Sequence, residues 1–551
     1  MTSAVAPLRY DSFRTIWISS IVSAVGTFIQ SVAGSWLMLE LTGSNTWVGL
    51  MVASSTLPLL FLALTAGALA DMFDRAKLML AAQAIMGVSA LAMAVLTVSG
   101  LINPGLLLGL GLLLGVGVAL NLPAWNALLP DLVPRGMIAS AVALQSAAFN
   151  VARAIGPAIG GVLVATVGPA LGFGLNAVTY GFVIVALLMV RRSVAAPERQ
   201  TASIATAIAL GLRYTRFTPV FARLLLLVSF FAITSSVVQS VLPGHAETLG
   251  GDAGTLGLLL GAMGAGALVG AFIRQRFLDV FRGRSQMLTI TGFGVSGIGV
   301  GLATAIPVTG IFMFLCGVFW VLTLTNLNAT AQLMSPEWIR GRAMSMYSLS
   351  FGGIVPIGAI LSGVLADAVG TGAAIVILCS GATLLGALSP RFNVPSLAEV
   401  ESPEFSGDRP EPVHDLTPDG GPVLVLNTWN IDDSDFGEFT AIMSEVRLVR
   451  LRTGAYRWRL LRNVSNPRRL TEMFALGSWE EHLAQHRRID DVSASLLARA
   501  RSFDRGDGPV TRHLIGIDVE NPPGFEDLVV THEEMHRNDG SIAKMEDQGS
   551  V

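Results

Sequence analysis

One basic residue in the first 391 positions stands apart from the others. Nineteen Lys and Arg residues precede position 392, and eighteen of them lie between apolar segments, whereas Arg153 lies in the middle of one. A central arginine costs about 2.5–3.5 kcal/mol on membrane-insertion scales, so it is expected to face a cavity or a partner. Three roles remain open: hydrogen bonds to carbonyls or to Asn150 and Gln145, recognition of an anionic or carbonyl-rich ligand, or a conformational latch.

Other polar and aromatic side chains inside apolar segments are suited to hold a small molecule. Polar groups orient a ligand in an apolar pocket, and aromatic rings contact its apolar part. For each of these side chains alone, packing or anchoring at the membrane interface is the alternative, and the sequence favours it. The candidates are Gln30, Trp36, Asn121, Asn126, Gln239, Asn326 and Asn328.

Groups that carry protons or metals are scarce. Proton coupling normally uses a carboxylate or histidine inside a span, but the carboxylates lie near segment ends, where Glu40 and Asp71 are the coupling candidates. His482 and His486 are four residues apart, a spacing compatible with two metal ligands. Since no third ligand is in register, we expect two solvated histidines and predict no metal, and no cofactor motif is present.

The basic residues outside Arg153 alternate along the chain. They occupy every second gap between apolar segments, and the intervening gaps carry none. Short cytoplasmic loops hold the Lys and Arg excess of membrane proteins, so the pattern predicts an even number of spans with both termini cytoplasmic. The eighteen residues are Arg9, Arg14, Arg75, Lys77, Arg135, Arg191, Arg192, Arg199, Arg213, Arg216, Arg223, Arg274, Arg276, Arg282, Arg284, Arg340, Arg342 and Arg391.

Composition agrees with a multi-pass membrane protein. The 551 residues are 52% hydrophobic, with a mean hydropathy of +0.61, which is too apolar for an ordinary soluble enzyme. At about 20 residues per helix, the turn signals give twelve spans. They are roughly 15–41, 46–70, 77–99, 104–129, 138–167, 171–190, 220–243, 254–273, 286–306, 309–333, 341–368 and 372–389.

An internal repeat relates the two halves of this part. A shift of 202 positions places Asn126 on Asn328, Gly156 on Gly358 and Gly161 on Gly363 without a gap. Such a repeat predicts an all-α fold of two parallel six-helix halves, residues 1–192 and 220–391, with a substrate site between them. Residues 193–219 are expected to form a cytoplasmic linker, containing either a short amphipathic helix or no helix.

The remainder of the chain differs physically. Residues 1–391 have 19 basic and 11 acidic side chains, and residues 392–551 have 17 and 28. Residues 392–421 are predicted to be a disordered linker and 519–551 a disordered acidic tail. Between them, residues 422–518 alternate as βαββαβ, which predicts a soluble α+β domain of the ferredoxin-like arrangement.

A short segment between the second and third spans carries a family resemblance. Gly67, Asp71 and Arg75 match the signature that the major facilitator superfamily has in this loop. The resemblance implies a gate that packs against the eleventh helix and locks the outward-facing state. Met72 and Asp74 depart from the signature, so the full charge relay is in doubt, and an ordinary helix stop with cytoplasmic charges is the alternative.

The segment after Arg153 carries a second resemblance. Gly156, Pro157, Gly160 and Gly161 resemble the Gly-Pro motif in the fifth helix of facilitator exporters, which implies that the two halves meet here and that transport is outward. The alternative is generic packing of small residues. Together with residues 23–44 and 57–58, the transporter part resembles the enterobactin-exporter-like, transmembrane secretion effector branch.

The C-terminal region resembles an extension that some members of that branch carry, through the segment 478–486. It is also similar to small monooxygenases of the dimeric α+β barrel type. We expect self-association or regulation from this domain, and the alternative is an enzyme that modifies the compound its own transporter moves.

Taken together, the sequence predicts a secondary exporter in the cell membrane and not an enzyme. It is expected to move a small amphipathic compound, siderophore-like or a drug, by alternating access, with a proton gradient implied by the resemblance. No phosphate-binding Gly-rich loop followed by Lys-Ser/Thr is present, which argues against ATP drive. The expected partners are the substrate, the lipid bilayer and a second copy of the chain through the C-terminal domain, with no nucleic acid. A non-transporting ligand sensor is a further alternative.

Overall fold

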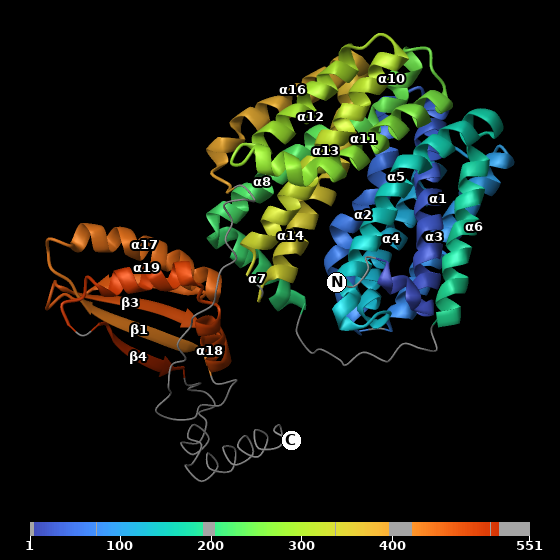
Figure 1. Cartoon of the computed structure of the whole chain (residues 1–551). Coiled ribbons are helices and arrows are strands. Elements are labelled where there is room, and N and C mark those ends of the chain that lie inside the picture. The colour runs from blue at the N-terminus through green and yellow to red at the C-terminus, as the bar shows by residue number, and fades with distance from the viewer. Residues whose placement is uncertain are drawn as a thin grey trace. The chain divides into compact units, whose positions relative to one another are not determined.

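The computed structural model describes residues 5–72, 74–190, 204–336, 338–395, 421–506 and 508–516 (Figure 1). The chain forms two compact units. The transport unit comprises Met1–Ile208, Val220–Met334 and Arg342–Val400, and the C-terminal unit comprises Ala209–Pro219, Ser335–Gly341 and Glu401–Val551. Residues 193–203 and 396–420 of the predicted linkers, and the predicted tail 519–551, lie outside the described residues.

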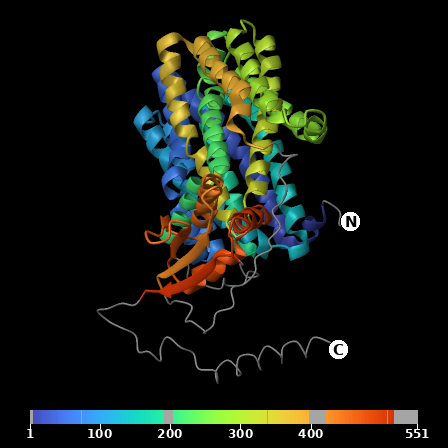
Figure 2. The same cartoon turned by 90° about the vertical axis from the view of Figure 1, so that its left-hand side faces the viewer.

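The first half of the transport unit consists of long helices that run side by side (Figure 1 and Figure 2). Capping residues mark where these helices end and begin. Gly43 ends the first helix at a φ of 61°. Asp74 accepts hydrogen bonds from the backbone N–H groups of Ala76 and Lys77 at the start of the third. The helices are α1 (Asp11–Thr42), α2 (Asn45–Met72), α3 (Arg75–Val98), α4 (Pro104–Leu128), α5 (Ile138–Val167) and α6 (Pro169–Val190).

The second half is more segmented than the sequence predicted. The segments expected at 220–243 and 341–368 are each interrupted, and a proline, Pro243 or Pro356, lies in the first turn of the last helix of each. Proline fits a first helical turn because its missing N–H is not needed there. The helices are α8 (Pro219–Ser235), α9 (Val237–Ser240), α10 (Leu242–Thr248), α11 (Ala253–Val280), α12 (Ser285–Leu302), α13 (Ile306–Met334), α14 (Arg340–Gly352), α15 (Val355–Val369) and α16 (Thr371–Leu388).

Eleven helical segments of the described residues are long and apolar enough to cross a membrane. The predicted segment without a counterpart among them is 286–306, which forms α12. That helix packs against α13 and α16, so it belongs to the same bundle.

The two halves of the transport unit meet along two helix pairs, α5 with α11 and α2 with α15. A Cβ at Gly161 would lie 2.6 Å from Gly257 Cα, and one at Gly363 would meet the backbone carbonyl of Asn45. Small residues allow membrane helices to approach this closely. Gly161 and Gly363 are the positions that the 202-residue repeat relates, so each occupies the corresponding contact of its own half.

The C-terminal unit contains a four-stranded antiparallel sheet in the order β2-β3-β1-β4. Alternate residues of β1 (Val423, Val425, Trp429) are buried on the sheet face that the helices α17 and α19 cover (Figure 1). The element order agrees with the predicted βαββαβ, except that the second helix is divided where Asp490 caps α19. The bounds are β1 (Val423–Asn430), α17 (Phe436–Thr453), β2 (Arg457–Arg462), β3 (Arg469–Leu476), α18 (Trp479–Arg487), α19 (Asp491–Arg501) and β4 (Val510–Ile515).

Residues Ile204–Phe217 of the predicted linker form the helix α7, and those from Ala209 onward belong to the C-terminal unit. Arg213 forms an ion pair with Glu481 of α18 at 3.2 Å. Tyr214 packs edge-on against Trp338, and burial raises the pKa of its hydroxyl to about 12. The unit therefore joins the sheet domain to the linker helix and to residues 335–341.

Candidate functional site: a cavity between the two halves

A cavity of about 310 Å³ lies inside the transport unit. Its walls come from α1 to α5 of the first half and from α9, α10, α11 and α13 of the second, so neither half forms it alone. Much of the lining is apolar, as in sites for small organic ligands. The apolar side chains are Phe28, Val32, Met51, Val52, Met93, Leu114, Val118, Pro157, Pro243, Leu256, Leu260, Met263, Ala267 and Trp320.

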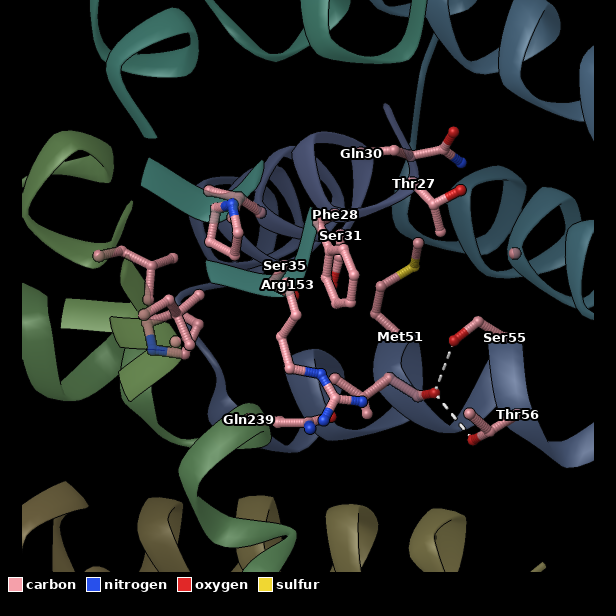
Figure 3. A pocket seen from close by; sticks show the side chains of 18 of the residues that line it. Thr27, Phe28, Gln30, Ser31, Ser35, Met51, Ser55, Thr56, Arg153 and Gln239 are labelled. Carbon is pink, nitrogen blue, oxygen red and sulfur yellow. Dashed lines mark hydrogen bonds between the residues drawn. The ribbon is translucent and has the colours of Figure 1, made fainter. Parts of the chain in front are cut away.

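A minority of the lining is polar, and Arg153 carries the only charge among the described residues that form it. Thr27, Ser31 and Ser35 of α1 form a polar stripe along the cavity, because residues four positions apart lie on one face of a helix. Figure 3 shows the guanidinium pointing into the cavity toward Gln239. The neutral polar members are Thr27, Gln30, Ser31, Ser35, Ser55, Thr56 and Gln239.

Three aromatic rings surround the Arg153 guanidinium. Its central carbon lies 4.4 Å from the centroid of the Trp320 ring, 5.1 Å from that of Phe149 and 6.0 Å from that of Phe28. Such distances allow cation–π attraction. The rings come from α13, α5 and α1, so both halves contribute to holding the charge.

No hydrogen bond or ion pair of Arg153 with a protein group occurs among the described residues. Asn150, an expected partner, donates instead to the carbonyl of Ser146 at 3.0 Å. The other expected partner, Gln145, has a buried Oε1 without a hydrogen-bond donor. The polar edge of the guanidinium is thus without an acceptor from this part of the chain.

Of the other predicted cavity residues, Gln30 and Gln239 line the cavity. The Gln30 side chain is positioned by α6 and α3, because its Oε1 accepts a hydrogen bond from Asn176 and its Nε2 lies 3.5 Å from the Met93 sulfur. Sequence reasoning missed Asn176, whose polar side chain is fully buried within an apolar helix. That position was the available signal.

Three other predicted residues, Trp36, Asn121 and Asn326, are engaged outside the cavity lining. Trp36 is one residue past Ser35, so it is rotated about 100° from the cavity stripe, and it donates to Glu40 at 2.6 Å. Asn121 accepts from Gln83 at 2.9 Å, and Asn326 donates to Ser285 at 3.4 Å. The side chain of Asn126 is outside the described residues.

Asn328 lines a second, more open cavity of about 430 Å³. Arg274, Tyr347 and Phe351 are among its other walls. Gln332 donates to Asn328 at 2.6 Å, so this amide already has one partner. Asn328 therefore does not contribute to the cavity that holds Arg153.

The predicted gate motif lies at the end of α2 and the start of α3. The side chains of Gly67, Asp71 and Arg75 lie outside the described residues, although α2 continues as a helix through the first two of them to Met72. The expected turn is thus shorter than the motif. Asp74, which departs from the family signature, caps α3.

The Gly-Pro segment of α5 faces two neighbours. A Cβ at Gly156 or Gly160 would meet Phe28 or Ile29 of α1, whereas Gly161 faces Gly257 of α11. Pro157 lies inside α5 and lines the cavity. The segment joins α1 to α5 within the first half as well as α5 to the second half.

A carboxylate that the sequence placed only near a segment end joins the halves at one end of the bundle. Asp367 of α15 accepts five hydrogen bonds from Ser44, Asn45 and Thr46, which lie before or in the first turn of α2. We call this the outer end, because the charge pattern predicts that it faces away from the cytoplasm. The signal that sequence reasoning missed is the Ser-Asn-Thr run at the start of α2.

His245 lies in α10, just after the candidate span Pro219–Ser240. Its ring nitrogens are 3.3 Å from Thr371 Oγ1 and 3.0 Å from the Val300 carbonyl oxygen. Burial lowers the pKa of the imidazole. This histidine therefore holds α10 to its neighbours in the neutral form.

The expectation of two solvated histidines in the C-terminal unit was wrong for His482. Its side chain is 1% exposed, because α18 presents it to β4, where its Nε2 lies 3.0 Å from His513 Nε2. Burial, followed by the nearby His486, His513 and Arg450, lowers the pKa of His482 to about 3. Among the described residues, no group of three potential ligands has the geometry to hold a metal.

A buried polar network crosses the core of the same unit. The Glu472 side chain is fully buried, and it accepts hydrogen bonds from Arg450 at 3.1 Å, Trp458 at 3.0 Å and Asn427 at 2.7 Å. Thr511 donates to Asn427 at 2.8 Å. Side chains from all four strands are thus linked to one carboxylate, directly or through Asn427. Arg450 links α17 to the same carboxylate.

Comparison with known proteins identifies the family. Residues 2–521 match the transmembrane secretion effector family, so the match includes the C-terminal unit as well as the helices. The chain belongs to this family of the major facilitator superfamily. The predicted superfamily membership and the prediction of a secondary transporter are confirmed.

Relatives with assigned names include transporters of two kinds. The chain is 28% identical to the multidrug efflux pump Tap of Mycolicibacterium fortuitum, over 70% of this chain and 96% of the pump. It is 26% identical to the enterobactin exporter EntS of Salmonella choleraesuis, over 62% of this chain and 82% of that exporter. It is 24% identical to the staphyloferrin A transporter of Staphylococcus aureus, over 64% and 89%.

Solved structures agree on the fold of this family member. A POT family transporter in complex with a thioalcohol-conjugated peptide matches with a TM-score of 0.58 at 13% identity, over 69% of this chain and 96% of the other. A bacterial homologue of the lysosomal transporter Spinster, inward-facing and occupied, matches with a TM-score of 0.56 at 14% identity, over 72% and 99%.

Proposed function

We propose that this transporter exports a small amphipathic compound, a drug or a siderophore-like molecule, through the cavity between its halves. The observation that carries the proposal is that both halves line one cavity with apolar walls and a few polar groups, while the named relatives are a drug efflux pump and siderophore transporters. Alternating access follows if the halves rock about that cavity.

In this proposal the substrate contacts Arg153, Gln30 and Gln239, which line the cavity. Trp36, Asn121 and Asn326 position helices, because each is engaged with a neighbouring side chain. We assign Asn126 and Asn328 to the cytoplasmic end of the bundle, opposite the outer end, at corresponding positions of the 202-residue repeat.

The gate residues act at two places in the bundle. Gly67, Asp71 and Arg75 close the cytoplasmic end, and Gly156, Pro157, Gly160 and Gly161 form the hinge face of α5. A proton gradient drives export, with Glu40 and Asp71 as the coupling carboxylates. Asp71→Asn is expected to abolish proton-driven uptake into inside-out vesicles; unchanged uptake with Asp71→Asn and with Glu40→Gln would remove both from coupling.

The architecture we propose has twelve spans, with α12 as the ninth, and both termini in the cytoplasm. The halves are residues 1–192 and 220–391, joined by 193–219, and a linker 392–421 leads to the domain 422–518 and the tail 519–551. The strand order and the βαββαβ sequence of elements support a ferredoxin-like domain.

We assign self-association rather than enzymatic activity to that domain. The sheet face opposite the helices carries apolar side chains, among them Leu424, Leu426 and Met473, beside the arginines Arg457 and Arg459. A second copy packed on this face would bury the apolar residues. Sedimentation of the isolated domain tests this: a monomer at micromolar concentration would contradict it.

Blocking the cavity tests the transport proposal. Ser31 lines the cavity and is exposed, so Ser31→Trp fills it without displacing buried atoms. The expected result is loss of substrate uptake into inside-out vesicles, whereas Val178→Trp, at a position 54% exposed on α6, retains it. Equal uptake by the two variants would contradict transport through this cavity.

A further inference from the structure

We infer that the cavity selects compounds that carry an anionic oxygen group, such as a carboxylate or a phenolate, attached to an apolar or aromatic body. Arg153 binds the anionic group. This inference rests on the proposed function, since it specifies the substrate class of the same cavity.

The charge of the cavity is the first step. Its described lining contains one arginine, no carboxylate, and otherwise serine, threonine, glutamine and apolar side chains. A charge in a low-dielectric enclosure interacts far more strongly than in water. A ligand of opposite charge therefore gains most from this cavity, and a cationic one is repelled.

The orientation of Arg153 is the second step. The rings of Trp320, Phe149 and Phe28 lie 4.4–6.0 Å from the guanidinium carbon, so aromatic contacts hold the group without using its N–H donors. A guanidinium offers its donors in a planar fork that matches the two oxygens of a carboxylate. No protein acceptor from the described residues occupies that fork.

The surroundings of the arginine supply the rest of the site. Gln239 lines the same cavity, the guanidinium points toward it (Figure 3), and its amide accepts and donates hydrogen bonds. Leu256, Leu260 and Met263 of α11 line the same cavity and provide apolar contact for the body of the ligand. The site thus has a charged end and an apolar wall.

A matched pair of compounds tests the inference: a fluorescent aromatic carboxylic acid and its neutral primary amide. Binding to the purified full-length protein and uptake into proteoliposomes are measured for the wild type, Arg153→Gln and Arg153→Lys. We expect Arg153→Gln to weaken binding of the acid 10- to 100-fold and to change that of the amide less than threefold. Arg153→Lys should restore part of the affinity for the acid.

The control is Arg274→Gln, which removes an arginine from the other cavity and should leave both compounds unaffected. Equal weakening of acid and amide by Arg153→Gln, or unchanged binding of the acid, would overturn the inference. Binding separates it from the proposed function: charge-selective binding without uptake in any vesicle would count against transport alone, whereas uptake of both compounds without charge preference would count against the inference alone.

An independent observation leads to a second inference. The structure assigns Asp367 as a latch that holds the outer ends of the two halves together. Its carboxylate accepts hydrogen bonds at 2.6–3.1 Å from Ser44 Oγ, from the backbone N–H and side-chain amide of Asn45, and from the backbone N–H and hydroxyl of Thr46.

The position of these donors explains how a single carboxylate can hold the outer ends of the two halves together. The backbone N–H groups at the start of a helix have no partner within that helix, and the helix dipole is positive there. Asp367 belongs to α15 of the second half, so it caps α2 of the first. When the halves separate at this end, α2 loses its cap, which favours the closed outer end.

Solvent access to Ser35, which lines the cavity and is buried, reports on the latch. We expect Asp367→Asn to raise labelling of a Ser35→Cys protein by an impermeant maleimide, applied from outside to right-side-out vesicles, at least threefold. The two native cysteines, Cys316 and Cys379, are buried and can be replaced to give a clean background.

Asp252→Asn is the matched control. Asp252 caps α11 of its own half through Thr255, so its loss removes a helix cap but no hydrogen bond between the halves. The double variant Ser44→Ala/Thr46→Val, which removes two donors and keeps Asp367, should raise labelling less than Asp367→Asn. Labelling of Asp367→Asn at the level of Asp252→Asn would overturn the latch.

Discussion

Two arginines inside this protein are held against aromatic rings in similar ways but have different partners. Arg153 of the transport unit lies 4.4 Å from the Trp320 ring centroid, and Arg450 of the C-terminal unit lies 4.5 Å from that of Phe474. Arg450 also forms an ion pair with the fully buried Glu472 at 3.1 Å, whereas Arg153 has no carboxylate partner among the described residues.

The difference indicates what each arginine is for. A buried charge whose donors are matched within the fold serves that fold, as Arg450 does by linking α17 to the sheet. A charge held by ring faces, with its donors directed into a cavity, is matched only when a ligand arrives. The same residue type is thus structural in one unit and a ligand-binding group in the other.

The largest effect is expected from breaking the matched pair. Arg450→Met leaves the Glu472 carboxylate buried without its cation, and breaking a buried pair from one side costs about 3–5 kcal/mol. The measurement is urea unfolding of residues 421–516. Arg499→Met, which removes an exposed ion pair with Glu438, should cost less than about 1 kcal/mol. A similar cost for both would show that Arg450 is not matched as the structure indicates.

A third buried base extends the comparison. His482 is held in the neutral form by burial, whereas Arg450 stays charged and is paired with a carboxylate. Its pKa is lowered from 6.5 to about 3 in the folded domain, so protonation favours the unfolded chain. Stability is fully present above pH 6.5 and is lost as the pH falls toward 3. Each unit below 6.5 removes about 1.4 kcal/mol, so about 2 kcal/mol is lost by pH 5.

The check on His482 is a pH series of the same unfolding experiment. His482→Gln should flatten the curve between pH 6.5 and 5, since the variant has no imidazole to protonate at this position. A wild-type curve that is already flat in this window would mean that the His482–His513 contact does not keep the imidazole neutral.

The features of the fold that could be predicted from sequence are those marked by patterns extending over many residues. The alternation of basic residues and the repeat linking Gly161 to Gly363 extend over hundreds of residues, so the helical halves were predictable. Arg153 was detectable because a charge within an apolar segment is costly. The breaks within two predicted spans were missed, since apolar composition continues across them and Pro243 and Pro356 fit a first helical turn.

Contacts between distant segments were beyond reach. Asp367 and Ser44 are more than 300 positions apart and hydrogen-bond at 2.6 Å; the Ser-Asn-Thr run at 44–46 marks the start of a helix but does not indicate a partner so distant in sequence. His513 gave no signal beside His482 because the helix spacing that drew attention to His486 does not apply to a strand. Trp36 was expected in the cavity, although one position along α1 turns a side chain from the cavity to Glu40.

A smaller effect is expected for the unmatched arginine. Arg153→Met leaves no carboxylate of the described residues without its partner, so the free energy of unfolding should change by no more than about 1 kcal/mol, in contrast to Arg450→Met. Thermal unfolding of the detergent-purified transporter measures this. A loss as large as that of Arg450→Met would assign Arg153 to the fold and not to a ligand.

The smallest effect concerns the rings that hold Arg153. Phe149 is 44% exposed, so Phe149→Leu removes one cation–π contact at 5.1 Å with little loss of buried volume. One such contact at a partly exposed site is worth about 0.5 kcal/mol, which corresponds to about a twofold change in affinity. We expect binding of the aromatic acid to weaken about twofold while binding of its amide stays constant. A change for both compounds would mean that Phe149 contacts the body of the ligand, and no change for either would mean that Trp320 and Phe28 suffice to hold the guanidinium in place.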